Sequence, residues 1–157
     1  MIDTKQFRDA LGEFATGVCI ATTAPPQGDA IGMTINSFSS VSLEPPLVLW
    51  SIHNSSDCFQ KFNDSEVFSI SVLSQAQEAL SNHFAKPGDH TLTPEHFIAS
   101  EFAAPVLKDA MATFECRVWA KYAGGDHTIM VGEVLRFGAT HGLSPLLFHG
   151  GGYGRKA

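Results

Sequence analysis

The chain has 157 residues, of which 44% are hydrophobic and 17% charged, and its formal net charge at pH 7 is −6. A single domain of this length buries roughly 70% of the surface that the unfolded chain exposes. The ten basic residues are scattered among sixteen acidic ones, which argues against nucleic acid as a partner. The apolar composition predicts surface covered by a second subunit, so we expect a homodimer.

The N-terminal residues lack the basic start and apolar core of a signal peptide, and no apolar run approaches the roughly 20 residues that span a bilayer. We therefore expect a cytoplasmic protein without a membrane partner. Cys19, Cys58 and Cys116 are odd in number and widely spaced, without a CxxC pair. This pattern predicts reduced, mostly buried thiols.

A short amphipathic helix is predicted at the start, capped by Thr4 and ended by Gly17. Strands are expected over 18–23 and 30–36, joined by a hairpin connection. The polar stretch that follows has no regular pattern. Because the diproline before residue 47 cannot donate ladder hydrogen bonds, a new and central strand is expected over 47–52.

Ser55 or Ser56 is expected to cap a second short helix, whose N-terminus would be an anion site. The alternation over 67–73 predicts a strand, and Ser74 then caps a third helix.

Residues 86–105 have little periodicity and predict a long loop with one short helical turn. Alternation returns at residue 113 and again over 127–137, which predicts a hairpin of two long strands around a Gly-Gly-Asp turn. A short strand over 146–149 precedes a glycine-rich tail. About seven strands in hairpin order with two or three short helices predict a mainly β fold, a closed or split antiparallel barrel, in one domain over residues 1–157.

The common catalytic signatures GxGxxG, GxxxxGK[ST], HExxH and GxSxG are absent. The stretch His149-Gly150-Gly151-Gly152 imitates the oxyanion strip of lipases, but no nucleophile elbow accompanies it. His83, His90 and His96 are loosely spaced and are interpreted as solvated loop histidines, so no metal is predicted.

A hydroxyl-rich and amide-rich segment at residues 34–40 lies between two apolar runs. Its neutral donors and acceptors would suit a flat heteroaromatic ligand with alternating polar atoms. The same composition equally fits an ordinary hydrogen-bonded turn, and periodicity does not decide between them.

Five blocks, in order over nearly the whole chain, resemble the flavin reductase-like domain family. They are residues 7–18, 32–49, 83–85, 125–134 and 145–148 with Tyr153. The members most similar are small NAD(P)H:flavin oxidoreductases that supply reduced flavin to two-component aromatic monooxygenases. The resemblance implies a homodimer with an FMN-binding split β-barrel, a separate oxygenase partner, and NADH or NADPH as hydride donor to FMN or FAD.

The resemblance also implies roles for individual residues. The implied flavin contacts are Met33, Thr34, Asn36 and Ser37 at the ring, Ser51, Ile52 and His53 on the ribityl side, Ser55 and Ser56 at the phosphate, and Phe84, Ala85 and Lys86 at the outer part of the cofactor. His127 and Tyr153 would contact the nicotinamide nucleotide. Main-chain amides of residues 34–37 would stabilise negative charge near flavin N1. For Ser55 and Ser56 a plain capping role stays open.

The chain departs from the family at Gly152, where many relatives have a basic residue before the C-terminal tyrosine. The choices between FMN and FAD and between NADH and NADPH stay open. Two other functions remain as alternatives. One is a flavin-binding module without turnover, and the other is an oxidase of the pyridoxamine-phosphate class, which the sparse basic residues disfavour.

Overall fold

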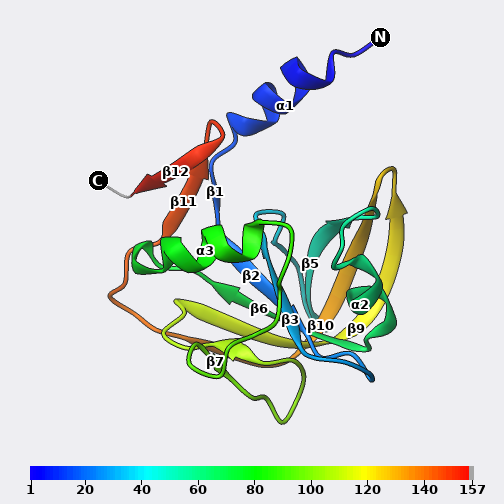
Figure 1. The fold of residues 1–157 in the computed structure, drawn as a ribbon, viewed down its shortest axis with the longest axis vertical. Coiled ribbons are helices and arrows are strands. Elements are labelled where there is room, and N and C mark those ends of the chain that lie inside the picture. Colours follow the sequence, from blue (N-terminus) through cyan, green and yellow to red (C-terminus); the bar gives the residue numbers. More distant parts are fainter. Residues whose placement is uncertain (156–157) are drawn as a thin grey trace.

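A computed structural model describes residues 1–155. Its helices and strands, shown in Figure 1, are α1 (Thr4–Gly12), β1 (Thr16–Gly17), β2 (Cys19–Thr23), β3 (Ile31–Ile35), β4 (Ser39–Leu43), β5 (Pro46–His53), α2 (Phe59–Asp64), β6 (Val67–Val72), a 3-10 turn (Gln75–Gln77), α3 (Glu78–Ala85), β7 (Phe97–Ile98), β8 (Val106–Leu107), β9 (Ala112–Gly124), β10 (His127–Ala139), β11 (Leu146–His149) and β12 (Gly152–Arg155). None of the described helices is long and apolar enough to cross a bilayer.

Within the described residues the strands form one large sheet and two small ones. The large sheet has the order β3-β2-β6-β9-β10-β5-β4, with antiparallel neighbours throughout. β1, β11 and β12 form a second sheet, and β7 pairs with β8. The mainly β, antiparallel architecture with short helices is confirmed, as is the long β9–β10 hairpin.

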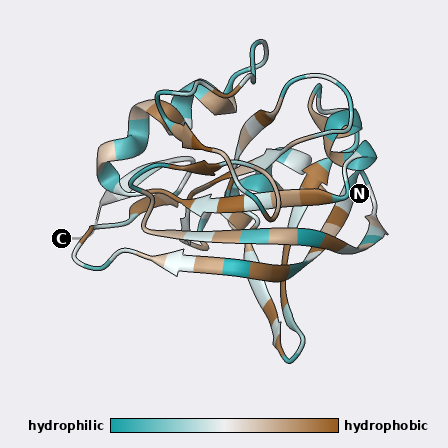
Figure 2. Ribbon diagram, turned by 90° about the horizontal axis from the view of Figure 1, so that it is seen from below, coloured by the Kyte–Doolittle hydropathy of each residue, from teal (hydrophilic) through white to brown (hydrophobic). Residues whose placement is uncertain are grey.

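Two apolar clusters form the core. In the first, the fully buried Trp50 meets Phe62 and Phe68 edge to face, at ring distances of 4.9 and 5.9 Å. The second lies against α3 and includes Phe84 and Leu146. Figure 2 shows brown and teal bands alternating along several strands, as expected when successive side chains point to opposite faces.

β6 is buried on both faces although its serines alternate with apolar residues. The Ser69 hydroxyl donates to the Ala104 carbonyl at 2.6 Å, and the Ser71 hydroxyl accepts from the Leu107 amide at 3.0 Å. The segment before β9 therefore covers the polar face of β6 and satisfies its hydroxyls.

The cap of α1 differs from the predicted one. Asp3 is the N-cap, and its carboxylate accepts from the Gln6 amide at 2.9 Å, so Thr4 is the first helical residue. The helix ends at Gly12, earlier than predicted, and Gly17 lies in β1 opposite Leu147. A carboxylate one position earlier takes the capping role because it accepts strongly from the first-turn amides.

The expectation that residues 37–42 are irregular was wrong for residues 39–43, which form the edge strand β4. This strand pairs with β5, with a shift in register between Ser40 and Ser42. An edge strand is held by main-chain hydrogen bonds and needs no apolar alternation, so side-chain periodicity gave no signal. Pro46 opens β5, where a missing amide proton is tolerated.

The expected serine cap of α2 was also wrong. The helix starts at Phe59 with Cys58 as its N-cap, and no side chain caps it. The Ser56 hydroxyl accepts from the Cys58 amide at 3.2 Å, and the Ser56 carbonyl accepts from the Phe59 amide at 3.0 Å. These bonds close a turn before the helix, so Ser55 and Ser56 precede α2, and this six-residue helix offers no N-terminal anion site.

Ser74 was predicted to cap the third helix, but it is the N-cap of the 3-10 turn before it, and the N-cap of α3 itself is Gln77. Ser74 forms a capping box with Gln77, and the 3-10 turn between them leads into α3. Cys19, Cys58 and Cys116 are unpaired and buried, so the predicted burial of the thiols is confirmed.

The loop after α3 holds the small β7–β8 hairpin, preceded by one turn in which the His96 and Phe97 amides both donate to the Thr93 carbonyl, in agreement with the predicted short helical turn. His90 in this loop is only 9% exposed, so its interpretation as a solvated histidine was wrong. The Gly32 amide donates to the His90 carbonyl at 2.9 Å, and Ile31 bridges to Thr91. These bonds hold the loop along the outer edge of β3, where the His90 ring is buried.

The predicted glycine-rich tail is instead the strand β12, which pairs with β11. The connection is tight because Gly150 and Gly151 both have positive φ, 59° and 78°, which side chains would disfavour. The resulting hairpin returns Tyr153 to a position opposite Phe148.

Candidate flavin site

A cavity of about 220 Å³ lies where β3, α3 and the β11–β12 hairpin meet. Four residues with sequence-predicted roles, drawn from three separate parts of the chain, share it. The lining residues are Val18, Thr34, Ile35, Asn36, Ala85, Phe148 and Tyr153. Apolar walls with a few polar groups at fixed positions are typical of a small-molecule site.

Ser81 of α3 joins two walls of this cavity, and sequence reasoning missed it. The Thr34 hydroxyl donates to the Ser81 carbonyl at 2.6 Å. The Ser81 and Tyr153 hydroxyls lie 2.6 Å apart, and Ser81 is fully buried. Its only signal in the sequence is a position three residues before the core residue Phe84, on the same helix face. This link fixes the orientation of the Tyr153 ring, which also packs edge to face on Phe148.

The outer edge of β3 presents a main-chain donor at the cavity. Since the Gly32 amide points away from β2 toward His90, the alternation of an antiparallel ladder directs the Thr34 amide the same way. Asn36, just beyond the strand, is exposed and lines the cavity. Main-chain and side-chain amides thus stand together along one edge.

Other predicted ring and ribityl residues have structural partners. The Ser37 hydroxyl donates to the Ser51 carbonyl at 3.2 Å and accepts from the Ser51 amide at 3.0 Å, which fastens the end of β3 to β5. Met33 is partly buried against the core. Ile52 and Phe84 are 1% and 2% exposed, so their side chains belong to the core, and contacts to a ligand from them would be through the main chain.

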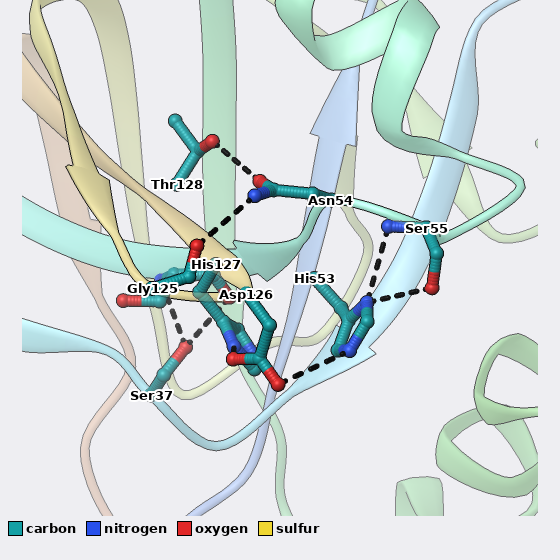
Figure 3. Close-up of polar contacts among 9 residues, drawn as sticks. Ser37, His53, Asn54, Ser55, Gly125, Asp126, His127 and Thr128 are labelled. Carbon is teal, nitrogen blue, oxygen red and sulfur yellow. Dashed lines mark hydrogen bonds and ion pairs between the residues drawn. The ribbon is translucent and has the colours of Figure 1, made fainter.

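A second group of polar residues lies at the paired ends of β5 and β10 (Figure 3). His53 and His127 face each other with ring centroids 4.9 Å apart. Asp126 joins them, with one carboxylate oxygen 2.7 Å from His127 Nδ1 and the other 3.5 Å from His53 Nε2. Both rings are nearly half exposed. This group is therefore open to solvent, unlike Ser81.

The hydrogen bonds assign the ring protons. A carboxylate only accepts, so His127 Nδ1 carries a proton toward Asp126 and Nε2 faces elsewhere. His53 Nδ1 accepts from the Ser55 amide at 3.1 Å, so its proton is on Nε2, toward Asp126. The hydrogen bond from His127 lowers the pKa of the Asp126 carboxyl.

Asn54 braces the turn that carries Asp126. Its amide nitrogen lies 3.4 Å from the Gly125 carbonyl, and its side-chain oxygen accepts from the Thr128 hydroxyl at 2.7 Å. The Asn54 main-chain amide donates to the Asp126 carbonyl at 2.9 Å. Sequence reasoning gave Asn54 no role, since its partners lie more than 70 residues away.

The segment predicted to hold a phosphate lies next to this group. The Ser55 hydroxyl is 2.8 Å from His53 Nδ1. The Gly88 amide donates to the Asp57 carboxylate at 3.4 Å, which holds the loop after Lys86 against the turn after Ser55. Ser55 and Lys86 are exposed, so polar groups from two distant segments lie at one surface.

The fold and the cavity together suit a protein that positions a flat ligand. The chain matches the family model described as the flavin reductase like domain over residues 11–157, and it belongs to that family.

Relatives and solved structures agree. The FMN reductase (NADH) SmoA of Agrobacterium fabrum is 46% identical over 153 residues, covering 98% of this chain and 86% of the relative. The reductase component of a flavin-dependent trigonelline monooxygenase from Acinetobacter baylyi is 37% identical, covering 95% of this chain but only 48% of the relative. The flavin reductase PheA2 superposes with a TM-score of 0.90 at 40% identity, covering 99% of both chains. The Streptomyces globisporus NADH:FAD oxidoreductase SgcE6, in complex with NAD and FAD fragments, gives 0.91 at 36% identity, covering 100% and 96%.

Proposed function

We propose that this protein is an NAD(P)H-dependent flavin reductase that reduces FMN or FAD. The observation that carries the proposal is the shared cavity, where Thr34, Asn36, Ala85 and Tyr153 meet although the sequence separates them widely. The relatives named as NADH-dependent FMN or FAD reductases support it.

The residues present fit a flavin ring. The walls of the cavity are apolar where a planar ring would stack, and Asn36 with the Thr34 amide provides donors along one edge. When bound, the flavin would supply the acceptor for a hydride from the nicotinamide. Neutral donors near its pyrimidine edge would stabilise the negative charge of the reduced ring.

The residues of the chain contribute by positioning the flavin and the nicotinamide. Tyr153, held by Ser81, forms one wall of the cavity beside Phe148. Ser37, by fastening β3 to β5, sets the distance between the cavity rim and the strand that ends at His53. No acid–base residue is needed within the cavity for this reaction class.

His127 is proposed to contact the nicotinamide nucleotide. Asp126 holds the proton of the ring on Nδ1 and leaves Nε2 for a polar group of the ligand. The half-exposed position suits a dinucleotide that binds and leaves in each turnover. We propose that Ser55, Ser56 and Lys86 meet the flavin phosphate, with Lys86 as the cation.

We further propose that a separate oxygenase receives the reduced flavin. Two relatives are named as the reductase component of a flavin-dependent trigonelline monooxygenase and as the reductase subunit of a stachydrine N-demethylase. A cytoplasmic location is consistent with the three unpaired, buried cysteines.

We propose a homodimer in which each copy is one domain with the split-barrel topology. Helix α1 stands away from the large sheet in Figure 1 and buries none of its residues. Its apolar residues Phe7 and Leu11 are 54% and 59% exposed, and Phe14 just after the helix is 79% exposed, more than a stable monomer is expected to leave. A Phe7→Ser, Leu11→Ser double variant should sediment as a monomer, and a wild-type monomer would contradict the dimer.

A steady-state assay tests the activity. NADH oxidation that depends on added FMN or FAD supports the reductase. Bound yellow flavin that neither NADH nor NADPH bleaches would instead support a module that holds flavin without turnover.

A further inference from the structure

His90 combines deep burial with a nitrogen that lacks a hydrogen-bond partner. Its Nδ1 lies 3.0 Å from the Gly32 carbonyl, which only accepts, so Nδ1 carries a proton. Its Nε2 is enclosed and makes no hydrogen bond to any described residue. Orphaned buried nitrogens are costly, so this one requires an explanation.

The group nearest to this nitrogen is a carboxylate. Asp57 Oδ1 lies 3.4 Å from Nε2, outside hydrogen-bond geometry. A bare Nε2 lone pair facing a carboxylate oxygen is repulsive, so the contact requires either a proton on Nε2 or a metal ion between the two groups. A proton on Nε2 would not point at the Asp57 oxygen with hydrogen-bond geometry. This favours a metal ion bound by both groups.

A third ligand atom completes the cluster. The Sγ atom of Cys58 joins His90 Nε2 and an Asp57 oxygen, and these three atoms lie within 4.8 Å of one another. Cys58 is 1% exposed, whereas the Asp57 side chain is 54% exposed and leaves a path for an ion and room for a water ligand. Sulfur, imidazole and carboxylate together form a donor set typical of Zn²⁺.

The distances are close to those of a filled site. Bonds of about 2.0–2.3 Å in a tetrahedron place ligand atoms about 3.3–3.8 Å apart, so a contraction of about 1 Å suffices. The bond from His90 Nδ1 to a main-chain carbonyl is the arrangement that orients metal-binding histidines.

We propose that Asp57, Cys58 and His90 bind a Zn²⁺ ion that clips the loop after α3 to the turn before α2. The Gly88–Asp57 hydrogen bond already brings these segments together, and the ion would tie Cys58 to His90, which are 32 positions apart in the sequence. This site departs from the sequence prediction of no metal, and it stands independently of flavin reduction.

Cobalt titration of the tag-free, flavin-free and chelator-treated protein tests the proposal. One equivalent of Co²⁺ should give a thiolate-to-cobalt charge-transfer band and tetrahedral d–d bands, which Zn²⁺ then removes. Cys58→Ser should abolish the charge-transfer band. His90→Gln and Asp57→Asn should weaken Co²⁺ binding by more than the roughly 10–100-fold cost of losing an outer-shell partner.

Asp89→Asn and His83→Gln, which lie in the same region but outside the cluster, are the matched controls and should bind Co²⁺ as wild type does. Circular dichroism checks that each variant is folded. A wild-type protein without the charge-transfer band, or a band that persists in Cys58→Ser, would overturn the proposal. The wild-type titration alone decides the first of these outcomes, even where a variant fails to fold.

Discussion

The hydrogen-bonded link at Ser81 is buried, whereas the polar group around Asp126 is exposed, and the two differ in how easily their contacts open. Ser81 is sealed from water and joins α3 to β3 and to β12 through hydrogen bonds of 2.6 Å. Asp126 joins His53 to His127 at a surface where both rings meet solvent. Buried hydrogen bonds are expensive to break, while exposed ion pairs are weak and screened by salt. The first arrangement suits a fixed cavity, and the second suits a ligand that is exchanged.

The largest effect is expected from enlarging the buried link. Ser81→Leu forces a bulky side chain into a fully buried position against Tyr153 and removes the Tyr153 hydrogen bond. Overpacking should lower the free energy of unfolding by about 2 kcal/mol and abolish saturable flavin binding. Urea unfolding and flavin fluorescence titration measure both. Asn82→Leu, on the exposed side of the same helix, should change neither, and a flavin affinity equal to wild type in Ser81→Leu would disprove the role of this wall.

A smaller effect is expected at the cavity rim. Asn36→Ala removes an exposed amide without disturbing the core and should weaken flavin binding about tenfold, the equivalent of one hydrogen bond of about 1.4 kcal/mol. Isothermal titration with FMN and with FAD measures the change. Asn82→Ala serves as the control amide. Unchanged affinity in Asn36→Ala would remove this residue from the site.

Substitutions in the exposed group around Asp126 should affect binding of the nicotinamide nucleotide and not binding of the flavin. His127→Ala is expected to raise the KM for NADH about three- to tenfold while the flavin dissociation constant stays within twofold. His141→Ala, in an exposed loop, is the control. If the flavin affinity fell instead, the two regions would not divide the ligands as proposed.

The smallest effect is expected from Asp126→Asn, which keeps the shape but removes the charge. The KM for NADH should rise about two- to fivefold at low salt and less at high salt, because exposed charges are screened. Asp29→Asn is the exposed control.

The pH dependence of stability gives a second readout for Asp126. Its pKa is lowered in the folded protein, chiefly by the hydrogen bond from His127, so its stabilising contribution is present above the unfolded pKa of about 3.9. This contribution is lost as the pH falls through the lowered folded value. The difference in Tm between wild type and Asp126→Asn should therefore shrink in acid, and a difference that grew in acid would contradict the assignment.

Much of the fold could be predicted from the sequence because its signals are local. Alternation predicted β6, β9 and β10, and Ser74 was expected as a cap, although it caps the 3-10 turn before α3. The edge strand β4 and the hairpin strand β12 were not predicted, because they are held by main-chain pairing, which leaves no side-chain periodicity. Ser55 and Ser56 were misassigned as caps because a serine turn and a serine cap have the same composition.

By itself, the sequence determined the long strands and the family, and it marked the segment around Asn36 as polar without deciding between a ligand edge and a turn. Only the tertiary structure decided that Ser81 links Thr34 to Tyr153, and that His90 is buried beside Asp57 and Cys58. The Ser81 contacts join residues 47 and 72 positions apart. Such contacts depend on how the sheet and the hairpins fold in three dimensions. Residues that are close together in the sequence therefore give no indication of them.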